Sequence, residues 1–185
     1  MRTFLALELP EEFKNELAGG ITQLQELLPQ GIKWVKKEHL HITMQFIGDV
    51  DPEKISELTS EFQSILNHLK PFTIYQPQLE AIPIRNPRLV WVKCNFICPE
   101  LSVVVDRIRQ YLEKEGLEID KKTFRLHITL GRIKKSIEKK AIENLFRVNL
   151  RDTKWKVSEA TFYESRLQPE GPEYRKIATF NLQEV

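Results

Sequence analysis

The segments 39–46 (HLHITMQF) and 126–132 (LHITLGR) hold the side chains of this chain that are best suited to chemistry. Both contain the tetrapeptide Leu-His-Ile-Thr. In a β-strand alternate side chains point to the same face, so His and Thr lie on one face while Leu and Ile lie on the other. Each segment therefore predicts a strand that buries its apolar face and presents one imidazole and one hydroxyl.

A single His-x-Thr pair is ordinary on a half-exposed strand, but its repetition changes the interpretation. The chain has only 4 His among 185 residues, and two of them stand in the same four-residue context. We therefore interpret His41 with Thr43, and His127 with Thr129, as two parts of one active site.

Two imidazoles and two hydroxyls suit a displacement at phosphorus. In-line attack requires a base that takes a proton from the incoming oxygen and an acid that protonates the leaving oxygen, and His can do either near neutral pH. Thr hydroxyls can donate hydrogen bonds to the non-bridging phosphate oxygens as negative charge builds there. This chemistry needs no metal ion and no cofactor, and we expect neither.

Hydrophobic periodicity predicts the elements that must position these motifs. Apolar residues recur at helical spacing in four segments, and strand-like segments separate them. The expected helices are 11–28, 55–69, 99–115 and 137–146. The expected strands are 2–9, 34–35, 40–47, 72–75, 89–95, 126–133, 155–163 and 177–182.

The order of these elements divides the chain into two similar halves, each with a helix, a Leu-His-Ile-Thr strand and a second amphipathic helix. Short turns between several strands favour antiparallel pairing. We expect an α+β fold of two pseudo-symmetric lobes of antiparallel sheet covered by helices, with a central cleft that carries both motifs. Because no linker or low-complexity tract interrupts residues 1–185, we expect a single bilobal domain.

The chain resembles the 2H phosphoesterases, and specifically the LigT-like RNA 2′,3′-cyclic phosphodiesterases, also called 2′-5′ RNA ligases. The paired H-x-T-x motifs are the centre of the resemblance. It extends over nearly the whole chain through the segments 2–6 (RTFLA), 34–48 (WVKKEHLHITMQFIG), 87–91 (PRLVW), 124–132 (FRLHITLGR) and 165–174 (SRLQPEGPEY).

The resemblance implies hydrolysis of an RNA 2′,3′-cyclic phosphate to a 2′-phosphomonoester, and it also permits joining of RNA ends through a 2′-5′ linkage. It implies that His41 is the general acid that protonates the 3′ oxygen and that His127 is the base that activates water. Thr43 and Thr129 would bind the phosphate. His39 stands where the family commonly has Asn, and it shares the predicted strand face with His41.

Arginines and aromatic residues supply the remaining candidates for binding. The resemblance carries a basic residue at both Arg125 and Arg132. Strict alternation puts Arg125 on the face of His127 and Arg132 on the apolar face, unless the backbone turns at Gly131, so both stay candidates for the phosphate. Weaker candidates for contact with the substrate are His39, Phe46, Arg166 and Tyr174.

Charge is unevenly distributed along the chain. Overall, 28 Lys and Arg nearly balance 26 Asp and Glu, but the segment 121–140 has eight Lys or Arg against one Glu. A local positive field suits a phosphodiester ligand. We expect the partner to be an RNA or oligonucleotide with a 2′,3′-cyclic phosphate end, bound by a monomer.

The first residues contain an apolar run of about four residues, too short for an export signal or a membrane span. Cys94 and Cys98 lack the neighbouring ligands of a zinc site. We therefore expect a cytoplasmic protein with no membrane partner. Two other interpretations stay open: a zinc-dependent hydrolase that uses His39, His41 and His127, and a nucleotide- or RNA-binding module without turnover.

Overall fold

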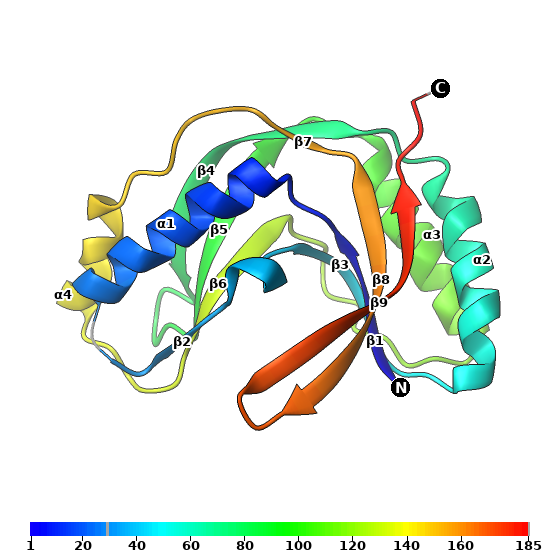
Figure 1. The fold of residues 1–185 in the computed structure, drawn as a ribbon, viewed down its shortest axis with the longest axis horizontal. Helices are drawn as coiled ribbons and strands as arrows, with labels where there is room; N and C mark the ends of the chain where they lie inside the picture. Colours follow the sequence, from blue (N-terminus) through cyan, green and yellow to red (C-terminus); the bar gives the residue numbers. More distant parts are fainter. Residues whose placement is uncertain (29, 185) are drawn as a thin grey trace.

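The computed structural model describes residues 1–28 and 30–184, and two antiparallel sheets organise it (Figure 1). Sheet A contains, in spatial order, β3 (Ile42–Asp49), β1 (Arg2–Leu7), β8 (Glu159–Gln168) and β9 (Gly171–Asn181). Sheet B contains β2 (Ile32–Trp34), β6 (His127–Ile133), β5 (Leu89–Phe96), β4 (Phe72–Ile82) and β7 (Trp155–Val157). The expected α+β architecture is confirmed.

Four α-helices and three 3₁₀ turns occur in the described residues. The helices are α1 (Glu11–Leu27), α2 (Ile55–Leu66), α3 (Glu100–Lys114) and α4 (Lys139–Ile142), and the turns are η1 (Lys37–His39), η2 (Pro52–Lys54) and η3 (Glu143–Arg147). Three predicted helices are confirmed with small shifts of their ends. The prediction of one helix over 137–146 is wrong, because only Leu145 of this segment is buried and little packing is available to extend an α-helix.

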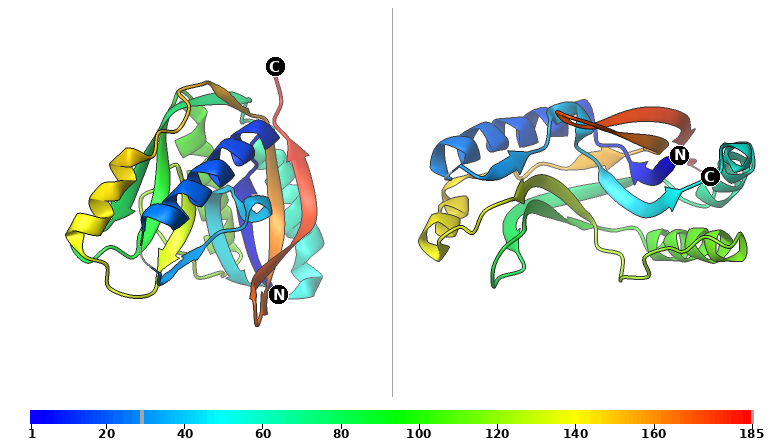
Figure 2. Two further views of the ribbon diagram at one scale, coloured as in Figure 1. Left: turned by 60° about the vertical axis from the view of Figure 1, so that its left-hand side comes forward. Right: turned by 90° about the horizontal axis from the view of Figure 1, so that it is seen from below.

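Two helices pack on the sheet to which their preceding strand does not belong. Helix α1 follows β1 of sheet A but covers sheet B, where Phe13 stacks on Trp155 of β7 with ring centroids 4.9 Å apart. Helix α3 follows β5 of sheet B but packs beside α2 and against β3 of sheet A (Figures 1 and 2). The two lobes are therefore interleaved along the sequence.

The chain also passes directly from sheet B to sheet A near the C-terminus. The prediction of one strand over 155–163 is wrong, since Ser158 separates β7, which pairs with β4, from β8, which pairs with β1. Strand β9 begins at Gly171, earlier than the predicted strand 177–182, and forms a hairpin with β8. Arg166 and Tyr174 thus lie in the arms of this hairpin.

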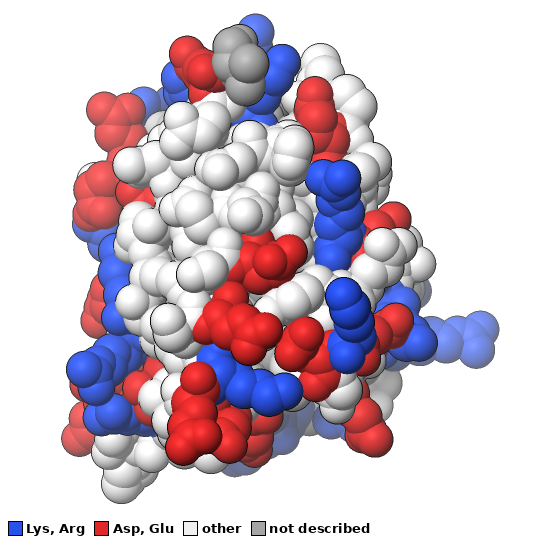
Figure 3. Space-filling model, turned by 90° about the vertical axis from the view of Figure 1, so that its right-hand side faces the viewer, with Lys and Arg blue, Asp and Glu red and all other residues white. Residues whose placement is uncertain are grey.

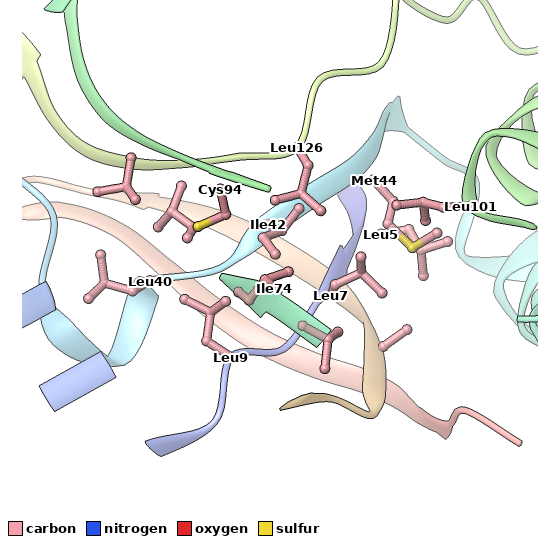
Figure 4. Close-up of a cluster of buried hydrophobic side chains, with 14 of the residues drawn as sticks. Leu5, Leu7, Leu9, Leu40, Ile42, Met44, Ile74, Cys94, Leu101 and Leu126 are labelled. Atoms are coloured by element: carbon pink, nitrogen blue, oxygen red, sulfur yellow. The ribbon is translucent and has the colours of Figure 1, made fainter. Parts of the chain in front are cut away.

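One continuous cluster of buried side chains joins both sheets and the helices. The Leu and Ile residues of both motifs belong to it, as strand alternation predicts. Part of the cluster is drawn in Figure 4, which labels Leu5, Leu7, Leu9, Leu40, Ile42, Met44, Ile74, Cys94, Leu101 and Leu126. No helix in the described residues is both long enough and apolar enough to span a membrane.

Candidate active site

Both motifs line one cavity of about 620 Å³ between β3 and β6. Nine of the ten residues predicted to serve the site line it: His39, His41, Thr43, Phe46, Arg125, His127, Thr129, Arg132 and Tyr174. Arg166 does not line the cavity; its Nε lies 3.2 Å from the Glu164 carboxylate. The fold therefore brings together side chains that are far apart in the sequence.

The two imidazoles are held in the same way. His41 Nδ1 lies 2.6 Å from the carbonyl oxygen of His39, and His127 Nδ1 lies 2.9 Å from that of Arg125. Since a carbonyl oxygen only accepts hydrogen bonds, Nδ1 carries the hydrogen in each neutral ring. In each ring Nε2 is therefore the nitrogen that can accept or deliver a proton.

Thr43 lies next to the reactive nitrogen of His41, with its Oγ1 2.9 Å from Nε2. The hydroxyl donates to the neutral ring. When Nε2 is protonated, it donates to Oγ1 instead, and the hydroxyl hydrogen becomes free for another acceptor. Protonation of His41 therefore prepares Thr43 to bind an anion.

A β-bulge follows Thr in each motif. In the pairing of β1 with β3, Leu5 and Ala6 pair with Gln45 and Thr43, so Met44 is the extra residue. In the pairing of β5 with β6, Val90 and Trp91 pair with Gly131 and Thr129, so Leu130 is the extra residue. A bulge shifts the alternation by one residue, so the side chains that follow it change face.

The bulges correct two predictions made from strict alternation. Strict alternation from Leu40 and Ile42 would put Phe46 on the apolar face, but Phe46 is 52% exposed and lines the cavity, with its ring centroid 5.7 Å from that of Phe4. Gln45 is expected beside His41, but it is buried. The bulge in β6 likewise brings exposed Arg132 into the cavity.

Gly131 stands where β3 has Gln45. A Cβ at Gly131 would lie 2.8 Å from side-chain atoms of Ile32 and Trp34, closer than a carbon contact allows. Glycine thus leaves room for the side chains of Ile32 and Trp34 from the paired strand β2.

His39 does not share a strand face with His41, contrary to the prediction, because η1 ends at His39 and β3 begins at Ile42. Its ring centroid lies 4.5 Å from that of Tyr174. His39 therefore contributes to the site in two ways: its carbonyl orients His41, and its ring supports Tyr174.

Aromatic rings flank both catalytic candidates. The Trp91 ring lies 4.3 Å from the His127 ring between centroids, and its Nε1 donates to Glu80. The Phe4 ring lies 5.1 Å from the His41 ring. Burial lowers the pKa of both His41 and His127; Arg125 and Arg132 lower that of His127 further.

The cavity has a positive balance of charge. Seven cationic side chains and four carboxylates line it. The cations are Lys33, Lys36, Arg109, Lys122, Arg125, Arg132 and Lys134.

The side of the molecule over α2 and α3 is different, because Asp and Glu gather there beside a broad uncharged area (Figure 3). Burial, and then Glu115, Glu57 and Glu61, raise the pKa of Tyr111 to about 12 on this side. An anionic ligand is therefore attracted to the cavity and away from these helices.

Sequence reasoning did not single out several residues of the cavity, among them Arg109 and Gln45. Arg109 on α3 donates from Nε to Gln45 Oε1 over 2.7 Å, and Gln45 Nε2 donates to the Asp120 carbonyl over 3.3 Å. Arg109 lies outside both motifs, and the second motif has Gly131 at the position of Gln45. Only the close approach of α3 to β3 makes them neighbours.

The three histidines of the zinc interpretation do not form a metal cluster. Residues 1–28 and 30–184 contain no group of three or more His, Cys, Asp or Glu side chains arranged to hold a metal ion. Cys94 and Cys98 are free thiols, and burial raises their pKa to about 12 and about 11.

Solved structures share this fold. The protein TT0787 of Thermus thermophilus superposes with a TM-score of 0.82 at 25% identity, and the match covers 98% of both chains. LigT of E. coli, solved in complex with 3′-AMP, superposes with a TM-score of 0.74 at 22% identity, covering 99% of this chain and 98% of that chain.

Similar sequences agree with the structural likeness. An RNA 2′,3′-cyclic phosphodiesterase of Methanocaldococcus jannaschii is 32% identical over 181 residues, which is 96% of this chain and 98% of that protein. Another of Thermotoga maritima is 30% identical over 186 residues, 96% of this chain and 93% of that protein. The model for the LigT like phosphoesterases matches residues 7–91 and 97–174. The chain therefore belongs to the LigT-like phosphoesterase family.

Proposed function

We propose that this protein hydrolyses RNA 2′,3′-cyclic phosphate ends to 2′-phosphomonoesters without a metal ion. The observation that carries this proposal is the pair of equivalent His-x-Thr motifs on strands from different sheets, facing one cavity with a positive balance of charge. The names of the M. jannaschii and T. maritima relatives support the same substrate.

In the proposed reaction His127 Nε2 accepts a proton from water, and the water oxygen forms a bond to phosphorus. The bond between phosphorus and the 3′ oxygen breaks, and His41 Nε2 gives its proton to that oxygen. The products are a 2′-phosphomonoester and a 3′-hydroxyl, with His127 left protonated and His41 neutral until solvent restores both. The hydroxyls of Thr43 and Thr129, with Arg125 and Arg132, stabilise the non-bridging oxygens. The same sequence, with an RNA 5′-hydroxyl in place of water as the attacking group, would join ends through a 2′-5′ linkage and leave a 3′-hydroxyl.

The decisive assay uses an oligonucleotide with a 2′,3′-cyclic phosphate, purified protein and excess chelator, with identification of the product. We expect turnover and a 2′-phosphate. Activity that disappears in chelator and returns with zinc would favour the zinc hydrolase. Binding without turnover would favour the binding module, and a 3′-phosphate product would contradict the assignment of the leaving oxygen.

Arg132→Ala is expected to lower kcat/KM by about 10- to 100-fold, because a hydrogen bond to a charged group contributes about 1.5–3 kcal/mol. Arg166→Ala is the matched control, since Arg166 pairs with Glu164 outside the cavity. Steady-state kinetics on the cyclic phosphate compare the two. Equal losses in both variants would argue against a phosphate contact by Arg132.

The pH dependence of kcat/KM is expected to reach its maximum below about 6.5, the ordinary pKa of His. Burial lowers the pKa of His41, so its acid form is lost as pH rises through this lowered pKa. Because the pKa of His127 is lowered as well, its neutral form, which acts as the base, persists to lower pH. A profile measured from about pH 5 to 8 checks this, and a maximum above about pH 7.5 would contradict it.

We also propose that residues 1–185 act as a single bilobal domain and as a cytoplasmic monomer. The continuous core supports the first statement, and the buried free thiols are in keeping with a reducing compartment. Sedimentation of the purified protein tests the monomer.

A further inference from the structure

Glu8 is a partly buried carboxylate that the reaction above does not use. Leu7 of β1 pairs with Ile42, and Ala6 pairs with Thr43. Glu8 follows Leu7 and His41 precedes Ile42, so continuing this register by one residue would set Glu8 opposite His41, where directly opposed side chains share a face about 5 Å apart at Cβ. The Glu8 backbone is fixed there by its N–H, which donates to the Glu159 carbonyl over 2.9 Å.

Two side chains hold the Glu8 carboxylate in place. The Tyr163 hydroxyl donates to Oε1, and Lys14 Nζ lies 3.6 Å from Oε2. The Glu8 side chain is 11% exposed and that of Lys14 is 15% exposed, so solvent screens this charge weakly. Tyr163 in turn stacks on Phe4, which flanks His41.

The charge around His41 is mixed. The titratable side chains that face His41 or Glu8 come from five parts of the fold: Glu8 after β1, Lys14 on α1, His39 on η1, Tyr163 on β8 and Tyr174 on β9. Burial of the ring lowers the pKa of His41 most strongly; the His39 carbonyl and then Glu8 raise it, whereas the charges of His39 and Lys14 lower it. Glu8 is the one anion in this set.

The equivalent position beside the other imidazole has the opposite charge. Strand β5 places Lys93 directly opposite His127. Arg125 and Arg132 lower the pKa of His127, after the larger effect of burial. Two imidazoles with the same backbone hydrogen bond and the same neighbouring Thr thus differ in the sign of the charge beside them.

We propose that Glu8, held by Tyr163 and Lys14, is a positioning residue that assigns the acid role to His41. Its negative charge stabilises the imidazolium there, while cations keep His127 unprotonated as the base. The inference rests on the proposed function, which defines the acid and base roles. The effect of the Glu8 charge on the pKa of His41 can be measured without substrate.

Histidine ring resonances of the free protein, titrated by NMR and assigned with single His variants, test the coupling. In Glu8→Gln the pKa of His41 is expected to fall by about one, and that of His127 to stay constant. Glu8→Asp keeps the charge and is expected to restore most of the pKa. Glu164→Gln is the matched control, because it removes another carboxylate whose side chain is 11% exposed but which pairs with Arg166.

Lys14→Met gives an independent variant if Glu8→Gln fails to fold. Loss of this cation is expected to raise the pKa of His41, the opposite direction. An unchanged pKa of His41 in Glu8→Gln, or in Lys14→Met, would overturn the inference, as would an equal fall in Glu164→Gln.

Kinetics connect the coupling to the acid role. In Glu8→Gln the decline of kcat/KM at high pH is expected to begin about one pH unit lower, with about tenfold less activity near pH 7 on the cyclic phosphate. Hydrolysis of a nitrophenyl phosphodiester is expected to be spared, since nitrophenolate leaves without a proton. Equal losses on both substrates would overturn the acid role. If the unaltered protein does not hydrolyse the cyclic phosphate, the proposed function is overturned instead. The NMR titration would still decide whether Glu8 raises the pKa of His41.

Discussion

His41→Ala and His127→Ala are each expected to lower kcat on an RNA 2′,3′-cyclic phosphate by about 10²–10⁴-fold, with a much smaller change in KM. In the proposed reaction each variant removes one of the two proton transfers, whereas Thr43, Thr129 and the arginines would still bind the phosphate. The double variant is expected to lose little more than either single variant, because the two groups act in the same step.

His68→Ala is the control for these variants, since His68 is exposed and does not line the cavity. Circular dichroism of each variant separates loss of chemistry from loss of fold. A variant of His41 or His127 that keeps more than about a tenth of the rate would contradict acid–base catalysis by that residue.

Phe62→Ala is expected to lower the free energy of unfolding by about 3–5 kcal/mol. Phe62 on α2 is fully buried and meets Phe162 of β8 edge to face, with ring centroids 5.0 Å apart at 89°. Loss of the ring leaves a cavity that the surrounding sheet fills only in part. Denaturant titrations measure the change.

The same variant tests whether the two sheets unfold together. All three Trp residues of the chain belong to sheet B: Trp34, Trp91 and Trp155. In a single cooperative domain their fluorescence transition shifts as far as the far-UV circular dichroism, although Phe62 packs on sheet A. Phe146→Ala, at a ring that is 81% exposed, is expected to change stability by less than about 0.5 kcal/mol. An unshifted Trp transition in Phe62→Ala would contradict the single domain.

Local pattern predicts the faces of the two motifs correctly. Leu40 and Ile42 are buried as alternation requires, and the same holds for Leu126 and Ile128. The polar residues of the motifs are partly exposed in the cavity: His41, Thr43, His127 and Thr129. Alternation fails two residues after Thr, at Gln45 and Gly131, because a bulge depends on pairing with a neighbouring strand and the motif itself does not encode that neighbour.

Contacts between segments far apart in the sequence determine the features that the local pattern does not predict. Ser158 is a single residue between two strand-like stretches, and no local signal there indicates that β7 and β8 join different sheets. Arg109 is one of several polar residues on α3, and only the packing of α3 on β3 brings it to Gln45. In the sequence Glu8 only ends an apolar strand, and its role depends on Lys14 and Tyr163.

A hinge needs two bodies joined by few connections, whereas the chain here passes between the sheets repeatedly. Strand β1 of sheet A leads through α1 to β2 of sheet B, β5 of sheet B leads to α3 on sheet A, and β7 leads directly to β8. Because these connections join the two sheets at several points, we expect the two imidazoles to keep their separation when a ligand binds. In that case the fit of a ligand's phosphate to a gap of set width, rather than closure of the two sheets around it, would decide which RNA ends are accepted.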